Sequence, residues 1–134
     1  MSLIDSSVII RTLRRIPQPH IDERLAELIS TGAAAINGVI LAEVLLGYTL
    51  QQEFDKVRRW LGAFVDVDVT ARTFDATAQL GVDLRRKGVT VALPALLIAA
   101  SAIEHDAVLM HADSDFDRIA RHTSLKVESY VDAV

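Results

Sequence analysis

The chain has 134 residues, of which 51% are hydrophobic and 5% aromatic, and its 18 acidic and 14 basic residues give a net charge of −4. That length fits one domain, residues 1–134, and the aliphatic composition favours helices packed on a sheet over a β-sandwich. The absence of cysteine excludes disulfides and thiolate metal sites, and no apolar run reaches the roughly 20 residues of a membrane span. We therefore expect a soluble cytoplasmic protein without membrane contact.

Short apolar stretches alternate along the chain with longer stretches of helical periodicity. The short stretches predict strands at residues 3–4, 33–37, 65–69, 107–110 and 127–130. The periodic stretches predict helices at residues 8–16, 20–30, 39–47, 51–64, 70–87 and 94–105, followed by a last helix capped by Asp113 or Asp115. This alternation predicts βαβ units and a three-layer α/β/α fold with a central, mainly parallel sheet of four to five short strands.

Acidic side chains follow the predicted strands. Asp5 comes directly after the first strand, and Asp113 and Asp115 come just after the fourth. Glu43 lies in the third helix, which is apolar nearly all round and which we therefore expect to be largely buried. Because parallel strands bring their carboxyl ends to one edge of the sheet, where such sheets bind ligands, we expect these acids to meet there.

Each acid also has a local interpretation that requires no ligand. Asp5, Asp113 or Asp115 can cap a helix, and Glu43 can pair with a single lysine or arginine. Several carboxylates at one edge, with no basic neighbour in sequence, nevertheless repel one another unless a cation lies between them. Hard oxygen ligands, with neither cysteine nor a histidine pair at zinc spacing, favour Mg²⁺ or Mn²⁺ over zinc.

Four segments resemble, in order, the motifs of PIN-domain ribonucleases. They are Leu3-Ile4-Asp5-Ser6-Ser7, Ile40-Leu41-Ala42-Glu43-Val44, Leu93-Pro94-Ala95-Leu96-Leu97-Ile98-Ala99-Ala100 and Leu109-Met110-His111-Ala112-Asp113-Ser114-Asp115-Phe116. The resemblance covers nearly the whole chain, at the length of the VapC toxins of bacterial toxin–antitoxin pairs. It implies an endoribonuclease that uses Mg²⁺ or Mn²⁺ and an activated water to cleave RNA, often tRNA or ribosomal RNA.

The resemblance also implies roles for single residues. It makes Asp5 a direct metal ligand, Asp113 a ligand directly or through water, and Glu43 the group that orients water or acts as general base. Asp115 is a weaker candidate ligand and is better suited to capping the next helix. The resemblance further implies a homodimer that is inhibited by a VapB antitoxin in a heterotetramer or larger assembly, with an antitoxin segment crossing the active-site groove.

One position departs from the family pattern. Ala95 stands where the family carries a metal-binding aspartate, and a methyl group cannot bind metal. Either the protein is a degenerate toxin, or alanine replaces aspartate so that a growth-arresting nuclease can be produced; the intact surroundings of the other acids favour the second interpretation. In both cases we expect this chain to bind metal weakly and to be nearly inactive.

Contact with RNA requires local positive charge in a chain that is acidic overall. Arg11, Arg14 and Arg15, expected on one helix face at i, i+3 and i+4 spacing, are our choice for binding RNA phosphates or acidic residues of an antitoxin. A solvated helix face without a partner remains open for all three.

Two other functions also remain open. A catalytically dead PIN-fold module could hold a partner, and Ala95 is the main support for that alternative. A phosphoacceptor receiver domain shares the α/β fold and the acids at strand ends. It requires a lysine near the site, however, and Lys56 and Lys87 lie in polar helices.

Overall fold

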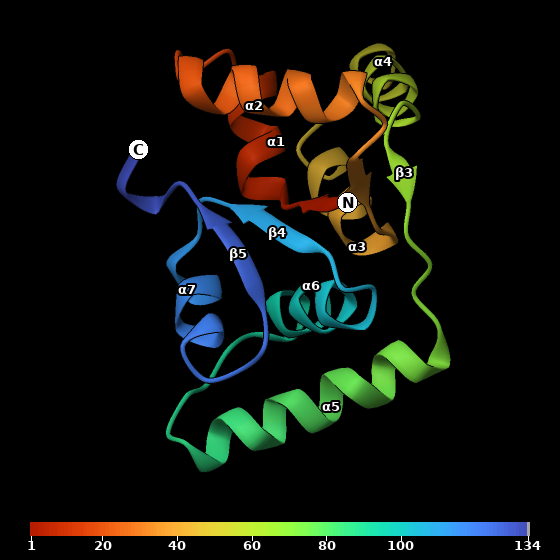
Figure 1. The fold of residues 1–134 in the computed structure, drawn as a ribbon. Helices are drawn as coiled ribbons and strands as arrows, with labels where there is room; N and C mark the ends of the chain where they lie inside the picture. Colours follow the sequence, from red (N-terminus) through yellow and green to blue (C-terminus); the bar gives the residue numbers. More distant parts are fainter. Residues whose placement is uncertain (134) are drawn as a thin grey trace.

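The computed structural model describes residues 1–133, which form one parallel five-stranded sheet in the order β3-β2-β1-β4-β5 (Figure 1). The strands are β1 (Ser2–Ile4), β2 (Ala34–Ile36), β3 (Val65–Asp66), β4 (Val108–His111) and β5 (Lys126–Ser129). The predicted α/β class with a parallel sheet is confirmed. The order differs from the 2-1-3-4-5 order of receiver-type domains, so the phosphoacceptor alternative is excluded.

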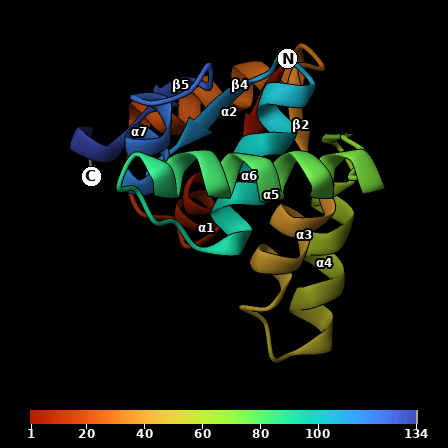
Figure 2. The ribbon, with the colours of Figure 1, turned by 90° about the horizontal axis from the view of Figure 1, so that it is seen from below.

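Helices cover both faces of this sheet. They are α1 (Ser6–Leu13), α2 (Pro19–Ser30), α3 (Gly38–Leu45), α4 (Gln51–Leu61), α5 (Ala71–Arg86), α6 (Leu93–Glu104) and α7 (Ser114–Ala120), followed by a 3-10 turn, η1 (Val131–Ala133). Figure 1 shows α1 and α2 above the sheet and α5 and α6 below it, and Figure 2 shows α5 crossing in front of α6. Of the helices within residues 1–133, none combines the length and the apolar content that crossing a bilayer requires.

Polar residues at strand ends start the following helices. Asp5, Asn37 and Asp113 come directly or almost directly after β1, β2 and β4, and each accepts a hydrogen bond from a backbone N–H in the first turn of the next helix. Such caps satisfy amide groups that have no partner inside the helix. Because the strands are parallel, all three caps gather at the carboxyl edge of the sheet.

The order in which successive strands are added to the sheet reverses at its centre, between β1 and β4. β1 and β4 are neighbours, but the chain leaves β1 towards β2 and leaves β4 towards β5. Such a switch opens a crevice at the carboxyl ends of the two strands. Ile4 pairs with Met110, and the Asp5 N–H donates to the Met110 carbonyl at 3.0 Å. Asp5 therefore lies beside the segment that follows β4.

Two predicted features of the fold are wrong. The third helix is not largely buried: Ile40 and Val44 are buried, but Glu43 is half-buried and Leu46, just beyond the helix, is 83% exposed. Ala42 on the outer side of α3 is exposed as well, and apolar sequence alone does not reveal this. The third strand spans Val65–Asp66 instead of residues 65–69, because after Val67 the chain leaves the sheet for α5.

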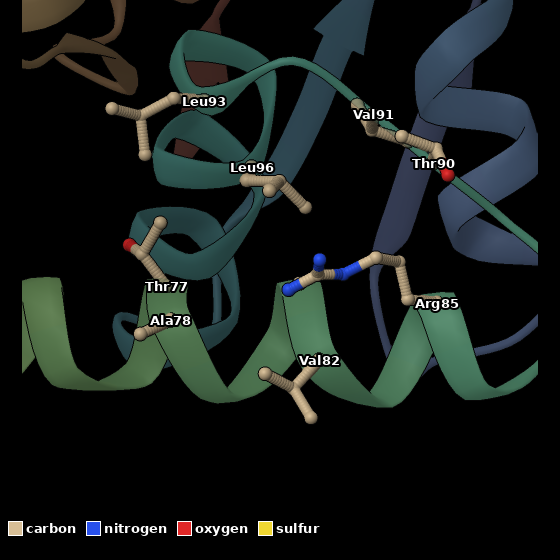
Figure 3. Close-up of a pocket in the computed structure, with 9 residues that line it drawn as sticks. Thr77, Ala78, Val82, Arg85, Thr90, Val91, Leu93 and Leu96 are labelled. Atoms are coloured by element: carbon tan, nitrogen blue, oxygen red, sulfur yellow. The ribbon is translucent and has the colours of Figure 1, made fainter.

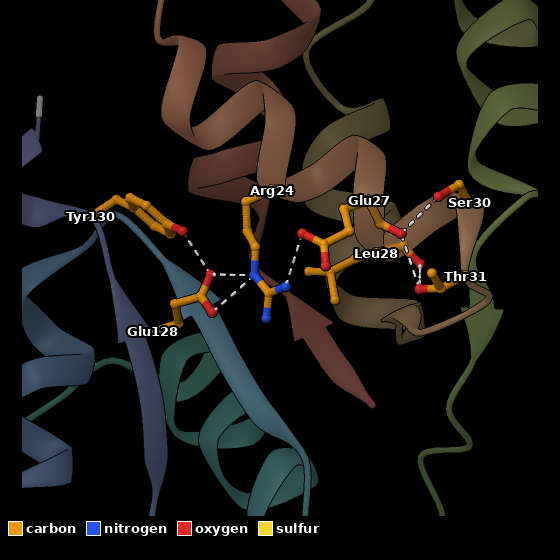
Figure 4. Close-up of polar contacts among 7 residues, drawn as sticks. All are labelled: Arg24, Glu27, Leu28, Ser30, Thr31, Glu128 and Tyr130. Carbon is orange, nitrogen blue, oxygen red and sulfur yellow. Dashed lines mark hydrogen bonds and ion pairs between the residues drawn. The ribbon is translucent and has the colours of Figure 1, made fainter.

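A polar cluster ties the edge strand β5 to α2 (Figure 4). The Arg24 Nε–H lies 3.2 Å from both carboxylate oxygens of Glu128, and the Tyr130 hydroxyl donates to Glu128 at 2.7 Å. Arg24 also pairs with Glu27 at 3.4 Å. Burial of the phenol, together with its bond to Glu128, raises the pKa of Tyr130 to about 12. The cluster joins segments about a hundred positions apart in sequence.

Candidate acidic site at the sheet edge

Asp5 is held firmly between β1 and α1. Its side chain is 3% exposed and caps α1 through the Ser7 N–H at 3.1 Å, while the Ser7 hydroxyl donates to the same carboxylate oxygen, Oδ2, at 2.5 Å. The Ser7 oxygen in turn accepts the Ala112 N–H at 3.0 Å. Ser7 thus links Asp5 to the segment between β4 and α7.

Glu43 reaches the same region from α3. It is half-buried, and its Oε1 accepts a hydrogen bond from the Ser6 hydroxyl at 3.2 Å. Ser6 and Ser7 are consecutive residues of α1, so one helical turn contacts both acids. The local sequence Asp5-Ser6-Ser7 therefore provides one acid, Asp5, and the two hydroxyl groups that orient Asp5 and Glu43.

The three acids share one electrostatic environment. Burial raises the pKa of Asp5, and the charge of Asp113 raises it further, against the lowering effect of the bonds from Ser7. Burial also raises the pKa of Glu43, and the charges of Asp5 and Asp113 add to this. Across residues 1–133, none of the three forms an ion pair with lysine or arginine. A cation from outside the chain would relieve their repulsion.

Asp113, and not Asp115, caps α7. Asp113 Oδ1 accepts the Asp115 N–H at 2.9 Å, whereas Asp115 lies inside the first turn and pairs with Arg118 at 3.2 Å. The expectation that Asp115 is the cap is wrong because the backbone is still extended at Asp113 (φ −127°, ψ 120°) and the helix begins at Ser114. With an arginine partner of its own, Asp115 is the less suitable metal ligand.

Ala95 lies in the first turn of α6. A crossover helix runs antiparallel to the strand that follows it, so α6 begins at the edge where β4 ends. Its N-terminus has neither a capping side chain nor an acid in the first turn, and position 95 is partly buried. A carboxylate at this position would be favoured by the helix dipole and would add a fourth acid to the edge.

The acidic residues of this edge are of the type that binds a hard divalent ion, but there are too few of them close together to form a complete site. Asp5, Glu43 and Asp113 supply carboxylate oxygens without a cationic partner, which is the ligand type that Mg²⁺ and Mn²⁺ prefer. Within the described range, residues 1–133, no three histidine or acidic side chains lie close enough to hold one ion together. The position that would supply a further donor is occupied by Ala95.

His111 is the main residue of this edge to which the sequence analysis gives no role. It ends β4 and is completely buried; its Nδ1 accepts the Asp113 N–H at 3.1 Å and its Nε2 lies 3.2 Å from Asp117 Oδ1. Burial lowers the pKa of His111, against the opposing effect of Asp117, Asp5 and Asp113, so the ring is neutral near pH 7. One feature of the sequence could have indicated this role. A polar residue ends an apolar strand and is followed by Asp113 two positions later and Asp117 six positions later.

The arginines do not share one helix face, contrary to the prediction. α1 ends at Leu13, Arg14 is its C-cap, and Arg15 has a φ of 54° and has left the helix. Pro17 favours this end, because in a continuing helix its ring would clash with the carbonyl four residues earlier, which is that of Leu13. In the part of the chain that the structure describes, Arg11, Arg14 and Arg15 have no acidic partner, so their charge is available.

Two hollows lie beside these elements. One, of about 530 Å³, separates α1 from α4 and is lined by Arg15, Tyr48, Lys56 and Trp60, among others. The exposed side chains of Leu46 and Leu50 belong to the adjoining connection between α3 and α4. This hollow combines apolar walls with the basic side chains of Arg15 and Lys56 and the acidic side chain of Glu53.

The second hollow, of about 400 Å³, lies between α5 and the beginning of α6. Leu93 and Leu96 of α6 line it, and Figure 3 shows the Arg85 side chain extending along α5 below Leu96. Arg85 is therefore a basic residue close to the helix start that carries Ala95.

Comparison with known proteins identifies the family and agrees with the fold. The PIN-domain family matches residues 2–122. Ribonuclease VapC11 of Mycobacterium tuberculosis is 34% identical over 134 residues, 97% of this chain and 99% of the relative, and Ribonuclease VapC51 is 32% identical over 131 residues, 90% and 86%.

Solved structures of VapBC complexes contain a similar fold. VapBC2 from Rickettsia felis, bound to a promoter DNA fragment, has a TM-score of 0.80 at 21% identity over 96% of this chain and 97% of that chain. DNA-bound VapBC from Salmonella typhimurium has a TM-score of 0.78 at 24% identity, over 97% and 99%. From the family match and the curated relatives, the chain belongs to the PIN-domain family and, within it, to the VapC proteins.

Proposed function

We propose that the protein is a Mg²⁺- or Mn²⁺-dependent endoribonuclease, the cytoplasmic toxin of a VapBC-type pair acting on tRNA or ribosomal RNA, and that Ala95 weakens this chain. The observation that carries the proposal is that Asp5, Glu43 and Asp113 lie at one sheet edge, where Ser6 and Ser7 link Asp5 to Glu43 and to the segment before Asp113, without a basic partner in residues 1–133. The relatives VapC11 and VapC51 are both named ribonucleases.

Asp5 and Asp113 are the proposed metal ligands, joined in a complete site by an aspartate at position 95. When bound, the divalent ion would polarise the scissile phosphate and stabilise the leaving oxygen. Glu43 suits the role of general base, because its raised pKa improves its ability to accept a proton at neutral pH. The Ser6 hydroxyl orients Glu43 through Oε1, so that Oε2 can accept the proton of the attacking water.

The proposed RNA contacts are made by Arg11, whose helix is capped by Asp5, with Arg14 and Arg15 beyond the helix end. Arginine suits phosphate because its planar donors match two oxygens at once. The hollow between α1 and α4, with Trp60 and Lys56 in its walls, is the proposed seat of an antitoxin segment in a dimeric assembly. The VapBC structures with this fold support that choice of partner.

The direct test is cleavage of labelled RNA by the Ala95→Asp variant in Mn²⁺, beside the unchanged chain and an EDTA control. We expect cleavage by Ala95→Asp that is lost in EDTA and strongly reduced in the unchanged chain. Adding Glu43→Gln to Ala95→Asp should reduce the rate roughly 100-fold or more, the usual contribution of a general base. No cleavage by Ala95→Asp across tRNA, ribosomal RNA and both metals would contradict the proposal.

A second function, a PIN-fold module that binds a partner without catalysis, is favoured by one observation. Residues 1–133 offer no three-donor metal group, and position 95 has lost its carboxylate. Under this alternative Ala95→Asp also fails to cleave RNA, while the unchanged chain binds an antitoxin segment equally well in Mn²⁺ and in EDTA. Metal-dependent cleavage of RNA by Ala95→Asp would support the nuclease proposal and contradict the binding-module alternative.

A further inference from the structure

His111 contacts the acidic edge through the backbone of Asp113. The Asp113 N–H donates to Nδ1 of the imidazole at 3.1 Å. A nitrogen that accepts a hydrogen bond carries no proton, so in the neutral ring the proton is on Nε2. Nε2 lies 3.2 Å from Asp117 Oδ1, a close electrostatic contact whose direction does not meet hydrogen-bond geometry. The hydrogen bond at Nδ1 therefore selects one tautomer of the ring, and the carboxylate beside Nε2 is compatible with it.

Both ends of this arrangement are fixed by other elements. Asp117 Oδ2 accepts the Ser129 hydroxyl at 3.0 Å, and the His111 carbonyl accepts the Tyr130 N–H at 2.8 Å. The ring also packs against Phe116, with centroids 5.2 Å apart. The imidazole is thus buried between β5 and α7, whose residues hold its backbone carbonyl and its neighbour Asp117.

The polar ring does more than fill space. An aliphatic residue would occupy the end of β4 without the cost of burying two ring nitrogens. Both partners of His111 belong to the segment that carries Asp113. One is the backbone amide of Asp113, and the other is the side chain of Asp117, one helical turn later. The specific effect of the imidazole is therefore to fix where β4 turns into α7, and with it the carboxylate of Asp113.

We propose that His111 is a positioning residue, which together with Asp117 holds the Asp113 backbone so that its carboxylate can join Asp5 in binding the metal ion. The proposal rests on the proposed function, because it assigns His111 a role in the same site. His111 itself touches neither RNA nor metal. Groups that orient a metal ligand typically contribute 10- to 100-fold to metal affinity.

The first test uses the unchanged chain and requires no metal. Nitrogen-15 spectra of the imidazole should show His111 protonated at Nε2, with Nδ1 unprotonated and accepting the Asp113 amide proton. In the Asp117→Ala variant this signature should be lost or weakened, while the far-ultraviolet spectrum stays unchanged. A ring protonated at Nδ1 in the unchanged chain would overturn the proposal.

The second test measures Mn²⁺ affinity by electron paramagnetic resonance in the Ala95→Asp background. His111→Leu should weaken binding roughly 10-fold, and Asp117→Ala, at a half-buried position more tolerant of change, should weaken it in the same direction. His111→Asn keeps an acceptor for the Asp113 amide and should recover most of the affinity. Phe116→Leu is the matched control, since it alters packing beside the ring but none of its hydrogen bonds.

The outcomes separate the two proposals. If Ala95→Asp binds Mn²⁺ and the Asp117→Ala and His111→Leu variants bind as tightly as the Phe116→Leu control, the positioning role is wrong and the nuclease proposal stands. If Ala95→Asp binds no Mn²⁺, both fall together. Unfolding temperatures in EDTA identify a variant that does not fold. If His111→Leu does not fold, the Mn²⁺ affinity of Asp117→Ala tests the positioning role.

Discussion

Restoring a carboxylate at position 95 should make the stability of the protein depend on metal. Ala95→Asp places a charge in the first turn of α6, where the helix dipole contributes about 0.3 to 1 kcal/mol. The new charge also adds to the repulsion among Asp5, Glu43 and Asp113, at about 1 kcal/mol for a close pair in a water-like medium and more in a partly buried one. Without metal, we therefore expect the variant to be less stable than the unchanged chain by about 1 kcal/mol.

A bound ion reverses this balance. At a Mn²⁺ concentration about 100 times the dissociation constant, binding to the folded state alone contributes about 2.7 kcal/mol. For a chain of this size that corresponds to an increase of about 10 °C in unfolding temperature. Thermal unfolding of Ala95→Asp in Mn²⁺ and in EDTA measures the difference directly, and the unchanged chain should show little of it.

Ala92→Asp is the matched control for this measurement. Ala92 is the exposed N-cap of α6 and forms no side-chain cap, so an aspartate there should stabilise the helix by about 1 kcal/mol. The gain should be equal in Mn²⁺ and in EDTA. An Ala95→Asp variant without a Mn²⁺-dependent increase, or an Ala92→Asp variant with the same increase, would refute the reasoning that position 95 completes the site.

Three further predictions concern single groups. Asp5→Asn keeps the cap but removes a carboxyl group whose pKa the fold raises, so the variant should be more stable than the unchanged chain at neutral pH. Denaturation measured across pH should show this gain disappearing below about pH 4, where the carboxyl is protonated in both the folded and the unfolded state. Gly88→Ala, at a φ of 79°, should lower the unfolding free energy by about 1 kcal/mol, whereas Gly38→Ala, with open space and ordinary φ, should not. In an absorbance titration, Tyr130→Phe should remove a phenol step at about pH 12, and a Tyr130 step at the ordinary value of about 10 in the unchanged chain would contradict the effect of burial and of the bond to Glu128.

The fold was predictable because its signals are local. Asp5 and Asp113 mark helix starts by capping, and short apolar strands between helices require parallel pairing. Parallel pairing then places both acids at one edge without any knowledge of tertiary contacts. The same argument brought Glu43 near them, and the shared pKa effects are consistent with it.

What the sequence could not reveal depends on contacts between distant segments. The role of His111 requires Asp117 and Ser129 to come from two other elements, and no periodicity encodes that meeting. The exposure of Leu46 depends on the absence of a covering layer, which an apolar stretch does not predict. Arg15 was a different kind of error, because Pro17 already indicated that the spacing rule for an unbroken helix did not apply.

The order in which the strands are synthesised has a consequence for the acidic edge. β5 is the last strand along the chain, yet its Ser129 holds Asp117 and the following Tyr130 amide holds His111. A nascent polypeptide that has already exposed Asp5, Glu43 and Asp113 therefore still lacks the strand that holds Asp117 and His111 beside Asp113. Until residues 126–130 have left the ribosome tunnel, the Asp113 side of the edge lacks these two supporting contacts.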